Sequence, residues 1–410
     1  MPEDFKVWNP SRSFGYYACM DPALNPFAPG SGVKPPALVG RQPEIDAFDL
    51  LVARAKANAA GDRGILLTGL RGVGKTVLLN EFSELARRNG WLVVQFEAQP
   101  GEGGPEAVRK KLARELQLGA RRLRQTSAWS HLRQQGLGSI SNISISLGLQ
   151  GLTADLKFTP GRADSHALDI DLEEMVEDVS ESMRKARAGF ALVIDEMQDL
   201  DPDLLGALLT VQHAAGQRGW PFYIVGAGLP SLPGRLAESR SYAERLFHYR
   251  KVGQLDPTAA AEALTVPIER LGAVLRGEPL RTVLAAAGGY AYFLQAYGRT
   301  LWEVASETEI TLGDASLAVE LGTADLDHGF FVSRWQRATR AERNYLRAMS
   351  QDGEGPTATA DLIGRLGRDH SSLTSQRGRL IEKGIIFAPE HGQVQFTVPG
   401  MGAFIARQKE

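Results

Sequence analysis

The sequence predicts an α/β fold: a doubly wound domain with a parallel sheet, then an all-helical domain, then a small domain of helices and a hairpin. Three observations lead to this prediction. Short apolar segments alternate with helical segments as far as Gln254. Beyond Gln254 the strand-like segments stop and helical patterns follow. Near the C-terminus, helical segments precede a pair of short strand-like segments. We therefore treat the chain as several domains rather than one.

The predicted strands of the first domain are apolar on both faces, which is typical of a parallel sheet covered by helices. The predicted helix Thr76–Arg88 lies between the first and second of these strands and ends at Asn89-Gly90, a common helix stop. We expect this domain to span residues 37–254. Its four predicted strands are Gly64–Thr68, Trp91–Phe96, Phe190–Ile194 and Phe222–Val225.

Two segments do not follow this alternation. Residues 1–36 are rich in Pro, Gly and aromatic residues, and we predict an extended arm that packs on the next domain. Residues 139–160 place Ile140, Leu147 and Leu149 among polar residues with a period near two. That period, with nearby glycines, predicts a β-hairpin inserted into the first domain. No role for this insertion follows from its residues.

The second domain is predicted to be an all-helical lid over residues 255–328. Asp256-Pro257 is a strong helix start, because aspartate accepts hydrogen bonds at the N-cap and proline fits the first turn. Helical patterns then cover Ala259–Leu271, Leu280–Ala287 and Ala291–Ala305.

Residues 329–410 form the third predicted domain. Its helices are followed by strands at Ile385–Phe387 and Val394–Val398, joined by a turn at Pro389–Gly392. This order predicts a winged helix-turn-helix. The segment holds 12 basic and 8 acidic residues, a net charge of +4, within a chain whose net charge is -2. Any nucleic-acid contact must therefore come from a local patch.

Composition limits the class of protein further. Hydrophobic residues make up 43% and charged residues 23% of the 410 residues, which is ordinary for a globular protein. The single cysteine, Cys19, excludes an intramolecular disulfide and leaves little scope for a structural zinc site. The N-terminus lacks the order of a signal peptide, and no apolar run approaches the roughly 20 residues of a membrane span. We expect a cytoplasmic protein without a membrane partner.

The sharpest motif is GLRGVGKT, from Gly69 to Thr76, which fits the phosphate-binding pattern GxxxxGK[ST]. It follows a predicted strand and opens a predicted helix. Lys75 is predicted to reach the β and γ phosphates of ATP, and the Thr76 hydroxyl is predicted to bind Mg²⁺. The alternative is a glycine-rich turn without a ligand. The predicted nucleotide-binding residues here are Gly69, Arg71, Gly72, Val73, Gly74, Lys75, Thr76 and Val77.

A second motif, VIDEMQD, ends the third predicted strand. Asp195 follows four apolar residues, so it is predicted to lie at the carboxyl end of the sheet and to hold Mg²⁺. Glu196 is the predicted general base that activates the attacking water. The alternative is a pair of exposed acids after a strand. Gln198 either positions water or is a solvated side chain.

These motifs, with LVGR (Leu38–Arg41) and the strand FYIVGAG, resemble the AAA+ superfamily over roughly residues 36–405. The order of the domains resembles its initiator-like and archaeal-type branch and the related STAND ATPases. The resemblance implies that Leu38, Val39 and Gly40 line the adenine. It also implies that Arg245 is an arginine finger acting on a neighbouring subunit of a homo-oligomer, although a structural salt bridge remains the alternative for Arg245.

Two departures from the AAA+ pattern bear on the rate of hydrolysis. The fourth strand should end in a polar sensor residue, but it ends in Gly226-Ala227-Gly228. The lid sequence AAAGGYAYFLQ has alanine where the family has proline, and no arginine until Arg299. We therefore expect slow hydrolysis, with ATP acting as a switch.

The predicted recognition helix of the C-terminal domain is Ser371–Lys383. It would enter the major groove of double-stranded DNA while basic residues contact phosphates. The alternative is a domain that packs on the lid or binds protein. A second basic run at residues 109–124 is either a contact surface or a charged helix face. The predicted DNA-binding residues are Arg365, Arg368, Arg377, Arg379 and Lys383.

The sequence thus predicts an ATP hydrolase that uses ATP and Mg²⁺ and couples its nucleotide state to DNA. Two alternatives stay open. One is a STAND-like signalling or defence ATPase that binds a protein or small ligand instead of DNA. The other is a transposition or plasmid-maintenance helper that oligomerises on DNA. Salt-dependent DNA affinity separates the first alternative from the DNA-coupled hypothesis.

Overall fold

A computed structural model describes residues 20–408 except 60, 99–103, 127, 147–164 and 166. Its first domain is built on a parallel sheet with the strand order β2-β3-β4-β1-β5. Four of the five strands match the predicted ones closely, so the doubly wound α/β prediction is confirmed. The strands are β1 (Gly64–Thr68), β2 (Leu92–Glu97), β3 (Phe190–Asp195), β4 (Phe222–Gly228) and β5 (Phe247–Lys251).

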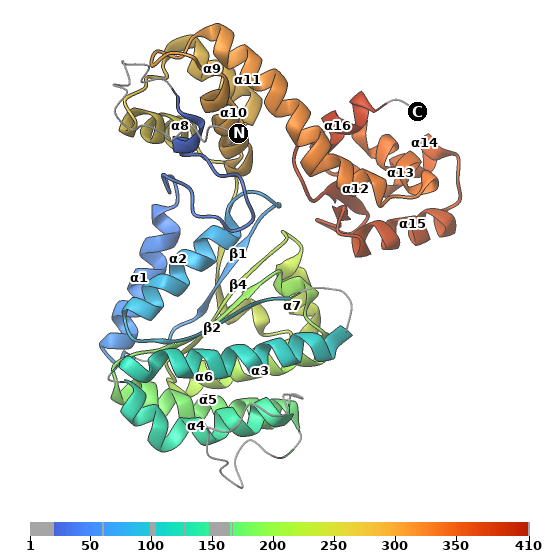
Figure 1. Cartoon of the computed structure of the whole chain (residues 1–410). Helices are drawn as coiled ribbons and strands as arrows, with labels where there is room; N and C mark the ends of the chain where they lie inside the picture. Colours follow the sequence, from blue (N-terminus) through green and yellow to red (C-terminus); the bar gives the residue numbers. More distant parts are fainter. Residues whose placement is uncertain are drawn as a thin grey trace, which may run out of the picture.

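Helices cover both faces of this sheet (Figure 1). Helices α1 (Gln42–Lys56) and α2 (Lys75–Arg88) pack together on one face. The other face is covered by α3 (Gly104–Arg122), α5 (Leu168–Lys185) and α6 (Pro202–Arg218), with the short α7 (Leu232–Ser239) beside α6. Helix α4 (Ala128–Ser146) forms an outer layer on α3 and α5.

Strand β5 was not predicted from the sequence. It pairs only with β1, at the edge of the sheet, and its residues His248 and Lys251 are exposed. A half-exposed edge strand lacks the continuous apolar run by which the buried strands are recognised.

The predicted hairpin at residues 139–160 is wrong where the structure describes it. Residues 139–146 belong to α4, and the remainder of the segment lies outside the described residues. Polar residues, mostly serines, are interleaved with Ile140 and Ile143 and resemble the pattern of a strand, although the two isoleucines are three residues apart. The Ser144 hydroxyl instead donates to the carbonyl of Ile140, 2.6 Å away, which is a helical i to i−4 contact. Small serines therefore let α4 pack closely against its neighbours.

The described part of the N-terminal arm lies against the helical domain and then crosses to α2. A 3-10 turn, Pro22–Leu24, begins after Asp21, whose carbonyl accepts a 2.9 Å hydrogen bond from Trp302 Nε1. Phe27 is buried against Gly298, where an added Cβ would lie 2.8 Å from the Phe27 ring. Further on, the carbonyl of Gly32 accepts a 3.1 Å hydrogen bond from Asn80 of α2. The arm thus bridges two domains.

The helical domain contains the three predicted helices and a further one. The three are α8 (Pro257–Arg270), α9 (Gly277–Ala287) and α10 (Ala291–Val304). The fourth, α11 (Leu312–Asp325), starts at Thr311 with a capping box that Asp314 completes. It continues through a π-helical segment, Leu326–Phe331, into α12 (Val332–Gln336) and so leads directly into the C-terminal domain (Figure 1).

The C-terminal domain places helices before and around a small antiparallel sheet of order β6-β8-β7. Its buried side chains and those of the helical domain form one hydrophobic cluster, separate from the core of the first domain. Phe331 stacks on Phe404 at 5.3 Å within this cluster. Its elements are α13 (Arg340–Ser350), β6 (Thr357–Ala358), α14 (Thr359–Leu366), α15 (His370–Glu382), β7 (Ile386–Phe387), β8 (Gln393–Phe396) and α16 (Met401–Arg407).

Among the described residues, no helix combines the length and the apolar character that a membrane crossing requires.

Candidate nucleotide-binding site

The phosphate loop connects β1 to α2 at the carboxyl edge of the sheet. Gly72 and Gly74 have φ angles of 85° and 100°, a region that side chains other than glycine rarely adopt. A Cβ on Gly69 would collide with the carbonyl oxygen of Val252. Because α2 begins at Lys75, the backbone N–H groups of the loop join the positive end of that helix. The loop therefore has the conformation and the polarity of an anion site.

Lys75 is held inside this loop. Its side chain is buried, and its Nζ donates to the carbonyls of Gly69 and Leu70, both 2.9 Å away. Burial lowers the pKa of Lys75, while Glu196 and Asp195 oppose that change. An ammonium that is removed from water in this way gains from any phosphate that replaces the lost hydration.

Asp195 and Thr76 meet as the sequence predicts. The Thr76 hydroxyl donates to Asp195 Oδ2 over 2.6 Å. Burial raises the pKa of Asp195, so a nearby cation would favour its charged form. Among the described residues, no group of three or more His, Cys, Asp or Glu could hold a metal ion. One carboxylate and one hydroxyl still fit Mg²⁺, which takes its other ligands from phosphates and water.

Glu196 is held by two side chains from different parts of the site. Its backbone has φ of 49°, in the left-handed region that is uncommon outside glycine. Arg71 Nη2 of the phosphate loop lies 3.4 Å from Glu196 Oε1. Gln198 Nε2 donates to Glu196 Oε2 over 2.7 Å. The carboxylate therefore lies next to the phosphate loop with both oxygens engaged.

The side chain of Gln198 lies at the end of β4, where the AAA+ pattern has a polar sensor residue and this chain has glycine. A Cβ on Gly228 would collide with Oε1 of Gln198, whose side chain is buried. That oxygen accepts a 3.1 Å hydrogen bond from the backbone N–H of Leu229. Gln198 therefore fills the space beside β4 and links it to Glu196. Burial, followed by the charge of Glu196, raises the pKa of the adjacent Asp199 to about 6.

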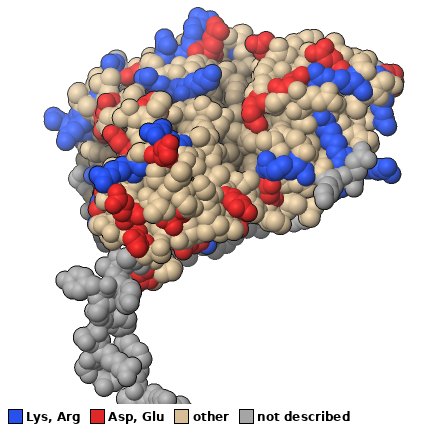
Figure 2. Space-filling model, turned by 90° about the horizontal axis from the view of Figure 1, so that it is seen from above, with Lys and Arg blue, Asp and Glu red and all other residues tan. Residues whose placement is uncertain are grey.

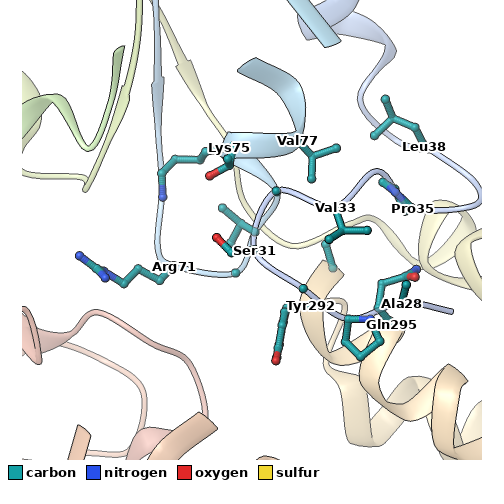
Figure 3. Close-up of a pocket in the computed structure, with 18 of the residues that line it drawn as sticks. Ala28, Ser31, Val33, Pro35, Leu38, Arg71, Lys75, Val77, Tyr292 and Gln295 are labelled. Atoms are coloured by element: carbon teal, nitrogen blue, oxygen red, sulfur yellow. The ribbon is translucent and has the colours of Figure 1, made fainter. Parts of the chain in front are cut away.

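A cavity of about 420 Å³ extends from the phosphate loop, which suits a small organic ligand. Leu38 and Val39 line it, whereas Gly40 does not and instead packs on Ala259 of α8. Figure 3 shows Leu38 and Val77 on one side of the loop, while Lys75 and Arg71 extend to the other. The cavity thus has an apolar end and a cationic end.

The N-terminal arm supplies part of this cavity, which the sequence did not predict. Ala28, Ser31, Val33 and Pro35 line it (Figure 3). A Cβ on Gly32 would lie 2.9 Å from Cγ2 of Thr76, so the arm passes directly over the start of α2. The arm contributes through backbone proximity, and no motif in its sequence marks such a contact.

The helical and C-terminal domains close the cavity from the other side. The Tyr292 N–H donates to the carbonyl of Gly72 over 3.1 Å, and its ring stacks on Phe330 at 4.7 Å. The Arg334 guanidinium lies 4.4 Å from the centre of the Phe330 ring. Burial, followed by the charge of Arg71, lowers the pKa of Arg334 to about 10. Arg334 was not predicted, because it lies in α12, beyond the expected lid.

Arg299 and Arg245 lie elsewhere. Arg299, the arginine expected from the lid, pairs with Glu303 at 2.9 Å and does not line the cavity. Arg245 is exposed in a 3-10 turn, Ala243–Arg245, before the first residue of β5. Since β5 runs parallel to β1, Arg245 lies at the sheet edge opposite the phosphate loop. Within one chain it does not reach the cavity, and its predicted role on a neighbouring subunit stays a prediction.

The predicted DNA-binding residues are largely engaged within the C-terminal domain. Arg365 pairs with Asp352 at 2.6 Å. Lys383 and Arg379 pair with the buried Glu342 at 2.6 and 3.6 Å. On the face shown in Figure 2, basic and acidic side chains are interspersed. The described part of the chain shows no ion pair for the other two predicted residues, Arg368 and Arg377.

Comparison with known proteins agrees with this site. Residues 37–223 match the family model of an AAA ATPase domain. Residues 328–405 match a model described as a domain of unknown function (DUF8462). No curated protein matches the chain. The phosphate loop, the Thr76–Asp195 pair and the family match identify residues 37–223 as a P-loop ATPase domain of the AAA+ type, and the resemblance is confirmed at that level.

Solved structures are similar to the chain at low sequence identity. The chain is similar to the Walker-type ATPase PABY2304 of Pyrococcus abyssi, with 15% identity, a TM-score of 0.54, and coverage of 89% of this chain and 95% of that one. It is also similar to Cdc6p of Pyrobaculum aerophilum, with 16% identity, a TM-score of 0.46, and coverage of 94% and 97%. The ORC1 protein of Aeropyrum pernix, solved in complex with DNA, has 16% identity and a TM-score of 0.44, with coverage of 91% of this chain and 93% of that one.

Proposed function

We propose that this chain is a slow ATPase in which ATP acts as a switch, and that its C-terminal domain is a winged helix coupling the switch to double-stranded DNA. One observation carries the switch: the C-terminal domain touches the phosphate loop. The backbone N–H of Arg71 donates to the carbonyl of Thr397 over 2.9 Å. Arg334 also enters the nucleotide cavity. A change at the phosphates therefore acts directly on how this domain is seated.

The proposed chemistry uses the groups that converge on the loop. Lys75 binds the β and γ phosphates, while Thr76 and Asp195 hold Mg²⁺, which neutralises charge on the phosphate oxygens. Glu196 takes a proton from the attacking water. Leu38 and Val39 contact the base at the apolar end of the cavity.

DNA coupling is supported by the order of elements in the C-terminal domain. The domain contains the helices α13, α14 and α15 and the sheet β6-β8-β7, an order of elements that is compatible with a helix-turn-helix and a wing. Helix α15 would then be the recognition helix, carrying Arg377 and Arg379. Arg368, just before α15, would contact a phosphate.

The test is a titration of labelled duplex DNA with and without ATP at two salt concentrations. We expect binding that depends on nucleotide and weakens with salt, since each phosphate contact releases counterions. The double variant Arg368→Ala/Arg377→Ala should weaken binding about tenfold or more. Lys75→Ala should remove the nucleotide dependence and leave the intrinsic DNA surface in place. If the affinity for DNA changes neither with salt concentration nor in these variants, the proposed surface is ruled out.

A second candidate has specific support. Arg365, Arg379 and Lys383 already pair with acids of their own domain, so fewer basic side chains remain available for DNA. This favours a signalling switch that binds a protein or ligand and not DNA. Retained ATP binding without DNA binding in any nucleotide state would select this candidate.

A further inference from the structure

Arg71 stands out among the residues of the phosphate loop. It is the third residue of GLRGVGKT, and its side chain extends to the same side of the loop as Lys75 (Figure 3). The side chain is 33% exposed, and the ion pair that it makes within the described chain is the one to Glu196, at 3.4 Å. Its Nε is buried and, among the described residues, has no hydrogen-bond partner. The guanidinium thus retains an unused donor inside the site.

The surrounding charges favour an additional anion. Arg71, Lys75 and Arg334 bring three cationic side chains to the cavity. Among the described residues no carboxylate pairs with Arg334, and the charge of Arg71 contributes to lowering its pKa. Asp195 is already bonded to Thr76. Glu196 is the carboxylate that pairs with Arg71, and Asp199 also interacts with the Arg71 charge. Two neighbouring guanidiniums still offer several donors, and one phosphate can bond to both.

The backbone around Arg71 is fixed, so only its side chain can change partner. The Arg71 N–H is bonded to Thr397 of the C-terminal domain. The next carbonyl, that of Gly72, accepts the N–H of Tyr292 from the helical domain. A loop that is held from both domains keeps its position while a long side chain rotates above it.

We propose that Arg71 is a positioning residue that exchanges between two partners, the Glu196 carboxylate and the terminal phosphate of ATP. With ADP, Arg71 stays on Glu196 and keeps that carboxylate away from water. With ATP, the γ-phosphate takes over the guanidinium and releases Glu196 to accept a proton from the attacking water. The inference rests on the proposed ATP site and adds to it a means of distinguishing ATP from ADP.

The experiment measures affinities of the full chain for ADP and for the nonhydrolysable β,γ-imido analogue of ATP. The proteins are wild type, Arg71→Ala, Glu196→Gln and the double variant. Arg71→Ala should weaken the analogue about fivefold or more and change ADP binding by less than about twofold. Arg71→Lys, which retains a point charge, should restore part of the preference for the analogue.

The sign of the coupling between the two variants decides the proposal. Exchange requires the Arg71–Glu196 pair to break when the analogue binds. Glu196→Gln should therefore tighten analogue binding more when Arg71 is present than in the Arg71→Ala background. A permanent pair gives the opposite sign, because Arg71 would then screen Glu196 from the phosphate. The exchange is overturned if Glu196→Gln tightens analogue binding equally or more in the Arg71→Ala background. It is also overturned if Arg71→Ala weakens the binding of ADP and of the analogue equally. Failure of wild type to bind either nucleotide overturns the proposed ATP site itself.

Discussion

The nucleotide site and the C-terminal domain use charge in opposite ways. At the site, Lys75, Arg71 and Arg334 line one cavity. The acids that line it lie at the carboxyl ends of two strands, with Asp195 and Glu196 at β3 and Glu97 at β2. In the C-terminal domain, Arg365, Arg379 and Lys383 pair with acids of the same domain. One of these acids, Glu342, is completely buried between Lys383 and the N-cap of α13. The comparison shows that a count of basic residues does not by itself predict a ligand surface, because some of those residues pair within their own domain.

The largest effect on nucleotide affinity should follow removal of the lysine inside the phosphate loop. Lys75→Ala should weaken ATP and ADP binding by about 100-fold, since a charge-assisted contact to phosphate is lost. Calorimetric titration measures this, with Lys56→Ala, an exposed lysine of α1, as the matched control. Near-normal affinity in Lys75→Ala would show that the loop does not bind phosphate.

Removal of the proposed base should act on turnover alone. Glu196→Gln keeps the size of the side chain, so nucleotide binding should persist while ATP turnover falls by about 100-fold or more. Phosphate release at saturating ATP measures the turnover, with the exposed Glu269→Gln as control. Unchanged turnover would remove Glu196 as the base.

The sequence predicted the site where the chemistry is local. Lys75, Thr76 and Asp195 lie in two short motifs at strand ends, and a parallel sheet brings such ends to one edge. Arg334 and the arm could not be predicted in this way. They come from segments far along the chain whose position depends on how the helical and C-terminal domains pack.

The errors have equally local causes. The serine-rich part of α4 resembles a strand, because polar serines are interleaved with isoleucines. Ile140 and Ile143 are nevertheless three residues apart, which is a helical spacing. Arg299, the first arginine after the lid motif, lies on α10, and its side chain pairs with Glu303. A position on the correct helix does not determine which face of that helix meets the cavity.

In the C-terminal domain, the comparison predicts that an acid stabilises the fold. Burial raises the pKa of Glu342, but the bonds from Lys383 and Thr339 outweigh it, so the pKa in the folded state lies below its usual value. Glu342→Gln should therefore lower the free energy of unfolding by about 1–3 kcal/mol. The loss should be complete above the unfolded pKa and should shrink as pH falls through the folded pKa.

Thermal melting of the full chain at neutral and acidic pH measures this effect. The exposed Glu382→Gln, at the end of α15, is the matched control. If Glu342→Gln melts like the wild type at neutral pH, the ion pairs to Lys383 and Arg379 do not hold the domain, and the contrast between the two regions fails.

The smallest effect is on thermal stability and should have the opposite sign to that of Glu342→Gln. It tests whether an acid of the nucleotide site lowers the stability of the folded protein. The pKa of Asp199 is raised to about 6, so the folded state resists its ionisation. Between the unfolded pKa and about 6, the folded protein binds the extra proton, and stability falls as pH rises through that window. Asp199→Asn should therefore raise the melting temperature at pH 7 by about 2–4 °C, with the gain vanishing near pH 4. A higher melting temperature of Asp199→Asn at pH 7, together with a lower one of Glu342→Gln, would show that Asp199 of the site opposes folding while Glu342 of the C-terminal domain supports it. A loss in both variants would mean that Asp199 is a structural partner of Gln198.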